Sequence, residues 1–142
     1  MNNRSVPVNS VLPHVGYRSV PEAIEWLTAV FGFREHYRYG EAGGVSGAQM
    51  YAGSAVIMLK KLKGTASPAE PGFVTQYLTI FIEDVEAHYQ RAKAAEAMIV
   101  EEPNETVYGE FQYAARDLEG HQWLFSRHAR DLAPEDWGGR SA

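Results

Sequence analysis

The chain has 142 residues, of which 45% are hydrophobic and 22% charged, and this composition excludes a disordered, fibrous or low-complexity protein. It contains no cysteine, which excludes disulfides, cysteine-ligated metal clusters and a thiol nucleophile. The net charge of -5 argues against a protein that binds a phosphate backbone, so no nucleic acid is expected as a partner.

No apolar run approaches the ~20 residues that a membrane-spanning helix requires, and the chain starts with the polar residues MNNR. We therefore expect no membrane partner and a cytoplasmic location. A basic cluster, Lys60, Lys61 and Lys63, follows an apolar stretch. The pattern is typical of a solvated strand end, and no function is assigned to it.

The first half of the chain predicts one helix among four strands. Residues 1–9 read as a flexible arm. The helix begins near Val20, because Ser19 is a suitable cap and Pro21 suits the first turn, and Gly32 is expected to end it. The predicted strands of this half are 11–17, 33–39, 47–51 and 55–62.

The second half repeats this order of elements. Residues 64–72 predict a linker, and a second helix begins near Asp84. An offset of about 65 residues aligns Val20 with Val85 and Ile24 with Tyr89. The predicted strands are 76–82, 98–102, 111–116 and 121–128. The prediction is one domain, 10–128, made of modules 10–63 and 73–128, with a C-terminal tail, 129–142.

Two stretches carry a family resemblance. Residues 20–33 contain VPEAIEWL followed by FGF, and residues 108–123 contain Tyr108-Gly109 followed by RDLEGHQW. Both resemble signatures of the vicinal oxygen chelate superfamily, which includes glyoxalases, bleomycin resistance proteins and dioxygenases. The resemblance is to the bleomycin-resistance-like branch. It implies an α+β fold of two βαβββ modules, whose curved mixed sheets form a cleft, and it implies a homodimer.

The resemblance also locates the positions that bind metal in some members. Those members use a His or Gln on the first strand of each module and a Glu late in each module. The aligned residues here are Leu12, Met58, Tyr77 and Leu124. None offers the oxygen or imidazole donors that divalent metals prefer, so no metal and no cofactor are expected.

The histidines and two acidic residues leave alternatives open. His14 lies two residues beyond Leu12, on the same strand face, and is either a ligand-binding or acid–base residue or a structural histidine. His121 favours a turn or helix-side hydrogen bond over a catalytic role. Asp117 and Glu119 favour turn or capping roles over paired acid–base catalysis. The remaining histidines, His36, His88 and His128, are expected at the surface.

Aromatic residues suggest a binding cleft. Gln122, Leu124 and Ser126 alternate with Trp123 and Phe125, and the latter two are assigned to the helix side. Five aromatic residues are expected to face or rim the cleft, although core or dimer packing is the alternative: Tyr77, Phe81, Tyr108, Phe111 and Tyr113. The predicted ligand-binding residues are Leu12, His14, Met58, Tyr77, Thr79, Tyr108, Gln122 and Leu124.

Three functions remain open at this point. The resemblance favours a metal-independent protein that binds a small organic molecule and sequesters a drug or metabolite. The alternative is an enzyme, a lyase, isomerase or dioxygenase that uses a metal or combines His14 with a tyrosine. A third interpretation is an accessory dimer without a small ligand.

Overall fold

Two four-stranded mixed sheets form the body of the protein in a computed structural model that describes residues 4–5, 11–63, 67–70, 72 and 74–141. The first sheet has the strand order β1-β4-β3-β2 and the second has the order β5-β8-β7-β6. The strand that comes first in the sequence of each sheet pairs in parallel with the one that comes last, β1 with β4 and β5 with β8. The other pairs are antiparallel. The strands are β1 (His14–Tyr17), β2 (Arg34–Glu41), β3 (Gly44–Ala52), β4 (Ala55–Lys61), β5 (Tyr77–Phe81), β6 (Met98–Glu105), β7 (Glu110–Arg116) and β8 (Gln122–His128). The predicted α+β fold of two βαβββ modules is confirmed.

The helix of each module begins at a polar cap. The α1 helix (Val20–Trp26) begins after Ser19, whose hydroxyl accepts a hydrogen bond from the Glu22 amide, and the α2 helix (Val85–Ala94) begins after Asp84. A π-helical turn, Leu27–Phe31, extends α1. Gly32 ends it with a left-handed φ of 73°, a conformation that favours glycine. The predicted start and end of the first helix are therefore confirmed.

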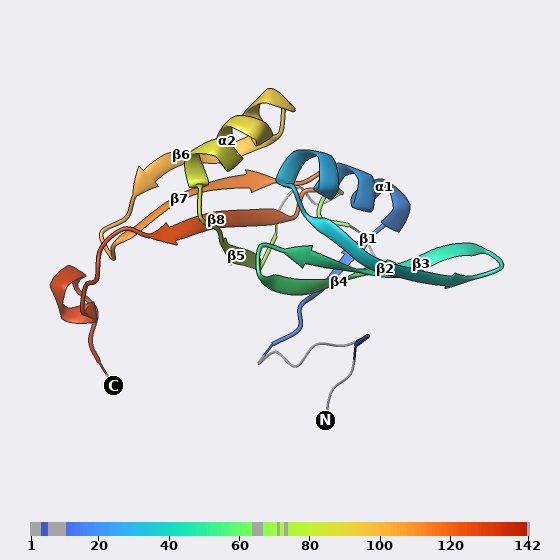
Figure 1. Ribbon diagram of the computed structural model, residues 1–142, viewed down its shortest axis with the longest axis horizontal. Helices are drawn as coiled ribbons and strands as arrows, with labels where there is room; N and C mark the ends of the chain where they lie inside the picture. Colours follow the sequence, from blue (N-terminus) through green and yellow to red (C-terminus); the bar gives the residue numbers. More distant parts are fainter. Residues whose placement is uncertain (1–3, 6–10, 64–66, 71, 73, 142) are drawn as a thin grey trace.

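Both helices cover the same side of the molecule, so each sheet has one covered face and one open face (Figure 1). Side chains alternate between these faces along each strand. On β8, Trp123 and Phe125 lie on the covered face with 1% and 0% of their surface exposed, which confirms their assignment to the helix side. Phe111 and Tyr113 share this face of β7 and pack in or against the core, so their expected place at the cleft was wrong.

An aromatic cluster joins the two modules into one core. Phe31 of the first module meets Phe125 of the second with ring centroids 4.8 Å apart, and Phe33 meets Trp123 at 5.4 Å. Both pairs are edge-to-face, a favourable arrangement for aromatic rings. The modules therefore bury their covered faces against a shared interior.

One turn of each module contacts the other module, and the two contacts are equivalent. The turn between β7 and β8 reaches β1, where the His121 ring lies 2.6 Å from the Gly16 carbonyl oxygen. The turn between β3 and β4 reaches β5, where Gly53 lies against the backbone of Phe81. The turn of each module thus contacts the first strand of the other.

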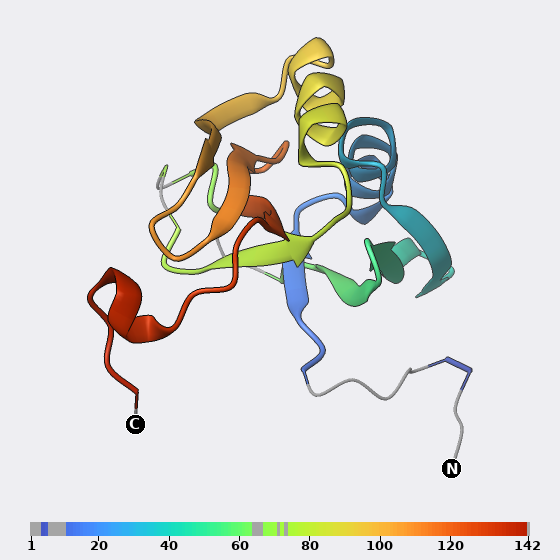
Figure 2. The ribbon, with the colours of Figure 1, turned by 60° about the vertical axis from the view of Figure 1, so that its left-hand side comes forward.

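The ends of the chain differ from the sequence prediction. The first strand begins at His14 rather than at residue 11. A short 3-10 helix, Pro134–Trp137, lies in the predicted tail and was missed; Figure 2 shows it on the side of the sheets away from α1 and α2. The predicted arm falls outside the described residues except at positions 4 and 5, as does the linker except at positions 67–70 and 72. Among the described residues, no helix is long and apolar enough to cross a membrane.

Candidate functional site

A cavity of about 370 Å³ lies between β1 and β5, the outer strands of the two sheets, and is called the seam cavity below. Since β1 and β5 are not paired with each other, no strand ladder closes the gap between them. The segment that connects the modules contributes Ser67, Pro68 and Val74 to its wall. The strand residues that line it are 14–16 on β1, Tyr77 and Leu78 on β5 with Thr75 and Gln76 before them, and Gln122 and Trp123 on β8 with His121 before them.

The seam cavity combines an aromatic ring with free polar groups. Tyr77 is 55% exposed there. His14 and Gln122 also line the cavity, and no hydrogen bond joins either side chain to another described residue. An aromatic wall with a few unpaired polar groups is the usual composition of a small-molecule site.

The carboxylates near the cavity are fully occupied by the protein. Asp117 accepts hydrogen bonds from the Tyr17 hydroxyl at 2.5 Å, from the Trp123 indole at 3.1 Å and from two backbone amides at 3.0 Å. Glu119 accepts from the amides of Arg18 and Ser19, at the start of α1. The expected turn roles are confirmed, and both carboxylates also tie the second module to the first.

Burial and this network change the acidity of Tyr17. Burial raises the pKa of the Tyr17 hydroxyl well above its ordinary value, and the negative charge of Asp117 adds to the effect. The hydroxyl therefore stays protonated and donates to Asp117. The His121 ring also packs edge-on against the Tyr17 ring at 4.9 Å, so His121 forms part of the contact between the modules.

His88 is half-buried, so its expected surface position was wrong. Its Nε2 lies 2.8 Å from the Phe31 carbonyl oxygen and must carry a proton to donate to it, while its Nδ1 meets the Tyr113 hydroxyl. Burial lowers the pKa of His88 to about 4, which keeps the ring neutral. The other two histidines differ: His36 is half-buried with its Nδ1 2.6 Å from Gln49, and His128 is exposed beside Glu110.

The eight predicted site residues do not all come together in one place. His14, Tyr77 and Gln122 line the seam cavity. Strand register puts Met58 opposite His14 and puts Leu124 opposite Thr79, on the open faces of the two sheets. Leu12 precedes β1 and is half-buried.

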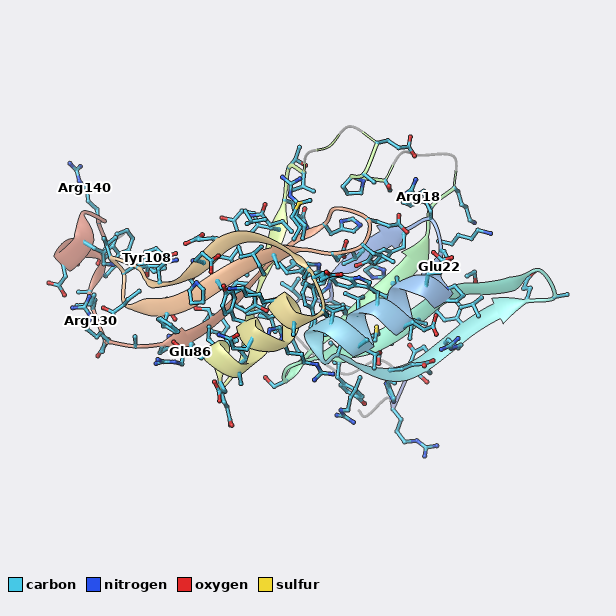
Figure 3. The ribbon with its side chains drawn as sticks, turned by 90° about the horizontal axis from the view of Figure 1, so that it is seen from above. Arg18, Glu22, Glu86, Tyr108, Arg130 and Arg140 are labelled. Carbon is cyan, nitrogen blue, oxygen red and sulfur yellow. The ribbon has the colours of Figure 1, made fainter. Side chains whose placement is uncertain are left out.

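Tyr108 stands apart from the other seven residues. Its ring packs edge-on against Trp137 with centroids 5.7 Å apart. Figure 3 shows it near Arg130 and Arg140, at the end of the molecule opposite Arg18 and Glu22. Within one chain, Tyr108 is therefore remote from the seam cavity.

The residues at the four metal positions do not fit a divalent ion. They supply alkyl, thioether and phenol groups, and the nearest imidazole, His14, has Met58 as its cross-strand neighbour. In the described part of the chain, no three His, Asp or Glu side chains are grouped so that they could hold a metal.

Sequence reasoning missed a second depression beside the seam cavity. It has a volume of about 600 Å³ and is lined by the Lys60, Lys61 and Lys63 cluster, to which no function was assigned. A signal for it was present, because Gly16 and Gly47 interrupt strands, where a glycine often marks a close approach by another group.

Comparison with known proteins agrees with this architecture. The model of the Glyoxalase/Bleomycin resistance protein/Dioxygenase superfamily matches residues 11–125. The chain belongs to this superfamily. The match includes both sheets up to β8 and ends before the 3-10 helix at Pro134–Trp137. No curated protein matches the chain significantly.

Three solved structures illustrate the relationship within the superfamily. TioX from Micromonospora sp. ML1 is 29% identical over 88% of this chain and 100% of its own, with a TM-score of 0.71. A bleomycin resistance determinant encoded on transposon Tn5 is 14% identical over 87% of this chain and 100% of its own, with a TM-score of 0.66. A bleomycin-binding protein complexed with bleomycin is 14% identical over 85% of this chain and 99% of its own, with a TM-score of 0.65. The last two share the fold with this chain.

Proposed function

We propose that this protein binds a small organic molecule with a planar part in the seam cavity, without a metal, and sequesters it as a drug or metabolite. The observation that carries the proposal is the convergence of the Tyr77 ring with the side chains of His14 and Gln122, which form no hydrogen bond with another described residue. The cavity volume of about 370 Å³ lies within the range of small-molecule sites, roughly 300–1,000 Å³. An aromatic face in this setting favours a planar or cationic group.

A structural neighbour from the superfamily also supports the binding of a small organic molecule. One structural neighbour is a bleomycin-binding protein solved with bleomycin, so this fold is used elsewhere to hold an organic ligand. The enzyme alternative lacks comparable support here. Among the described residues that line the seam cavity there is no carboxylate to pair with His14. Binding without chemistry therefore accounts better for this site.

The proposal includes a homodimer. Each sheet has an uncovered face, and β5 presents Tyr77 and Phe81 there with more than half of their surface exposed. A second copy that covered these faces would enclose the ligand and remove exposed aromatic surface from water. Light scattering should give twice the chain mass of 15.8 kDa. A monomer that persists on concentration would count against the dimer.

A thermal-shift screen of planar organic compounds tests the binding function directly. A ligand at 100 times its Kd stabilises the folded state by about 2.7 kcal/mol, which raises the unfolding temperature measurably. The shift should become smaller in Tyr77→Ala and Gln122→Ala and should not respond to a chelator. A compound whose thermal shift is the same in both variants as in the parent protein would overturn the proposed site. A thermal shift that a chelator abolishes would overturn metal independence.

A further inference from the structure

The second depression, called the lysine pocket below, adjoins the seam cavity along β1. Both are lined by residues 14–16 and by Leu62. The remaining lining of the lysine pocket is Tyr39, Ser46, Lys60, Lys61 and Lys63. His14 thus stands between the two hollows, and one ligand of moderate size could extend across both.

Strand register places a glycine on each side of Lys60. Its cross-strand neighbours are Gly16 on β1 and Gly47 on β3, and neither has a side chain. A Cβ atom at Gly16 would collide with the Leu62 side chain, and one at Gly47 would collide with the ring and hydroxyl of Tyr39. Leu62 and Tyr39 therefore fold over the two glycines and form walls on either side of Lys60.

The charge in the lysine pocket is not neutralised within the described chain. No carboxylate lies within ion-pair distance of Lys60, Lys61 or Lys63 among the described residues, whereas exposed arginines elsewhere do form such pairs. Three of the four lysines of the sequence lie in this one segment of a chain whose net charge is -5. A local positive site on an acidic protein attracts small anions and not an extended polyanion.

We propose that the lysine pocket binds an oxoanion, a carboxylate or a phosphate, on the same ligand whose planar body occupies the seam cavity. Lys60 supplies the positive charge between its two glycine neighbours, and the Tyr39 hydroxyl supplies a hydrogen-bond donor beside it. Lys61 and Lys63 add positive potential at the rim. This proposal rests on the proposed function, since the seam cavity holds the rest of the ligand.

The test compares four probes with one ring each: phenyl phosphate, benzoate, neutral benzamide and cationic benzylamine. Titrations at low salt are followed by amide chemical shifts in NMR. The two anions should bind at least about fivefold more tightly than benzamide, and benzylamine should bind less tightly than either anion. Shifts should centre on Gly16, Gly47 and Lys60. The ratio of phenyl phosphate to benzoate affinity identifies which oxoanion the pocket prefers.

Two substitutions separate a specific site from a general charge effect. Lys60→Gln should weaken the anionic probes about three- to tenfold and leave benzamide unchanged. Lys93→Gln removes the same charge from the exposed surface of α2, away from the residues that line the lysine pocket. It should change the affinity for neither the anionic probes nor benzamide. Gly47→Ala should also weaken anion binding, because the new methyl displaces Tyr39; its fold is checked by its amide spectrum.

The outcomes distinguish the two proposals. If anions and benzamide bind equally, or if Lys93→Gln acts as strongly as Lys60→Gln, the lysine pocket proposal is overturned, while loss of benzamide binding in Tyr77→Ala still supports the seam cavity. If anions bind at Lys60 and no probe responds to Tyr77→Ala, the lysine pocket stands and the seam cavity proposal fails. The absence of any anion binding at millimolar concentration overturns the lysine pocket.

Discussion

The buried contact between the two modules, called the junction below, and the seam cavity beside it contain similar residue types. They differ in whether the polar side chains have hydrogen-bond partners within the described protein. At the junction, Asp117, Glu119 and His88 all have hydrogen-bond partners within the protein. In the seam cavity, no described residue is a hydrogen-bond partner of the His14 side chain, and the Tyr77 ring is largely exposed. The comparison shows that residue type alone does not identify a functional site in this protein.

The physical reason is the cost of burial. A buried polar group must find a partner within the protein, because an unpaired one costs roughly 1–3 kcal/mol. The junction is buried, so its carboxylates and its imidazole are committed to the fold. In the seam cavity, His14 and Gln122 have no side-chain hydrogen bond to another described residue, so water can hydrate them and a ligand can replace that water.

The largest effect is expected at the junction. Phe125→Ala should lower the free energy of unfolding by about 3–5 kcal/mol, because this ring is fully buried against Phe31 and His88. Phe81→Ala makes the same chemical change on β5, at a ring that is 53% exposed, and should cost under about 1 kcal/mol. Urea denaturation measures both, and equal losses would contradict the division into a buried junction and an open face.

His88 should make the stability of the junction depend on pH. Its folded-state pKa of about 4 lies below the ordinary value of 6.5, so the unfolded chain takes up a proton first as the pH falls. The stabilisation is complete above pH 6.5 and is lost progressively down to pH 4, by up to about 3 kcal/mol. The ring meets the Phe31 carbonyl and the Tyr113 hydroxyl, and the positive charge of Arg91 adds to the lowering of its pKa by burial.

The variant His88→Gln separates this contribution from other titrating groups. Gln has no charge to gain, so the variant should show a flatter loss of stability between pH 6.5 and pH 4 than the parent protein. Thermal unfolding at several pH values measures the slope. Equal slopes in the two proteins would show that folding does not lower the pKa of His88.

A smaller effect is expected for the hydrogen bond between Tyr17 and Asp117. Tyr17→Phe removes one donor from a buried carboxylate that keeps its indole and amide donors, so the cost should be about 1.5–3 kcal/mol. Tyr77→Phe is the matched control, since its exposed hydroxyl has no hydrogen bond to a described residue. A double-mutant cycle with Asp117→Asn should show coupling, and additive effects would contradict a shared network.

The sequence predicted the order of the elements because that order follows from local patterns. Helical spacing after Ser19, the end at Gly32 and the offset of about 65 residues all reappear in the structure. The register agrees with the repeat, since His14 pairs with Met58 in the first module and Thr79 pairs with Leu124 in the second. The helix side of β8 followed from simple alternation along the strand.

Long-range partners could not be predicted in this way. Tyr17 and Asp117 are 100 residues apart in the chain, and His88 meets Phe31 across 57 residues. Tyr113 was expected at the cleft, but the alternation of β7 directs it into the core. The lysine pocket was missed because its walls depend on how Leu62 and Tyr39 fold over glycines on neighbouring strands.

The smallest predicted effect concerns two tyrosines that the sequence placed in the same site. Tyr77 lines the seam cavity, whereas Tyr108 packs against Trp137 at the far end of the same chain. For a planar ligand identified by thermal shift, Tyr77→Ala should weaken binding by about 0.5–1.5 kcal/mol, roughly two- to tenfold, through the lost aromatic contact. Tyr108→Ala should leave the affinity unchanged if the site is built by one chain. Calorimetric titration of both variants measures the difference. If Tyr108→Ala also weakens binding and the protein is dimeric by light scattering, a second copy must bring this residue to the ligand, because Tyr108 is remote from the seam cavity within one chain. If Tyr108→Ala weakens binding in a monomeric protein, the position assigned to the ligand is wrong.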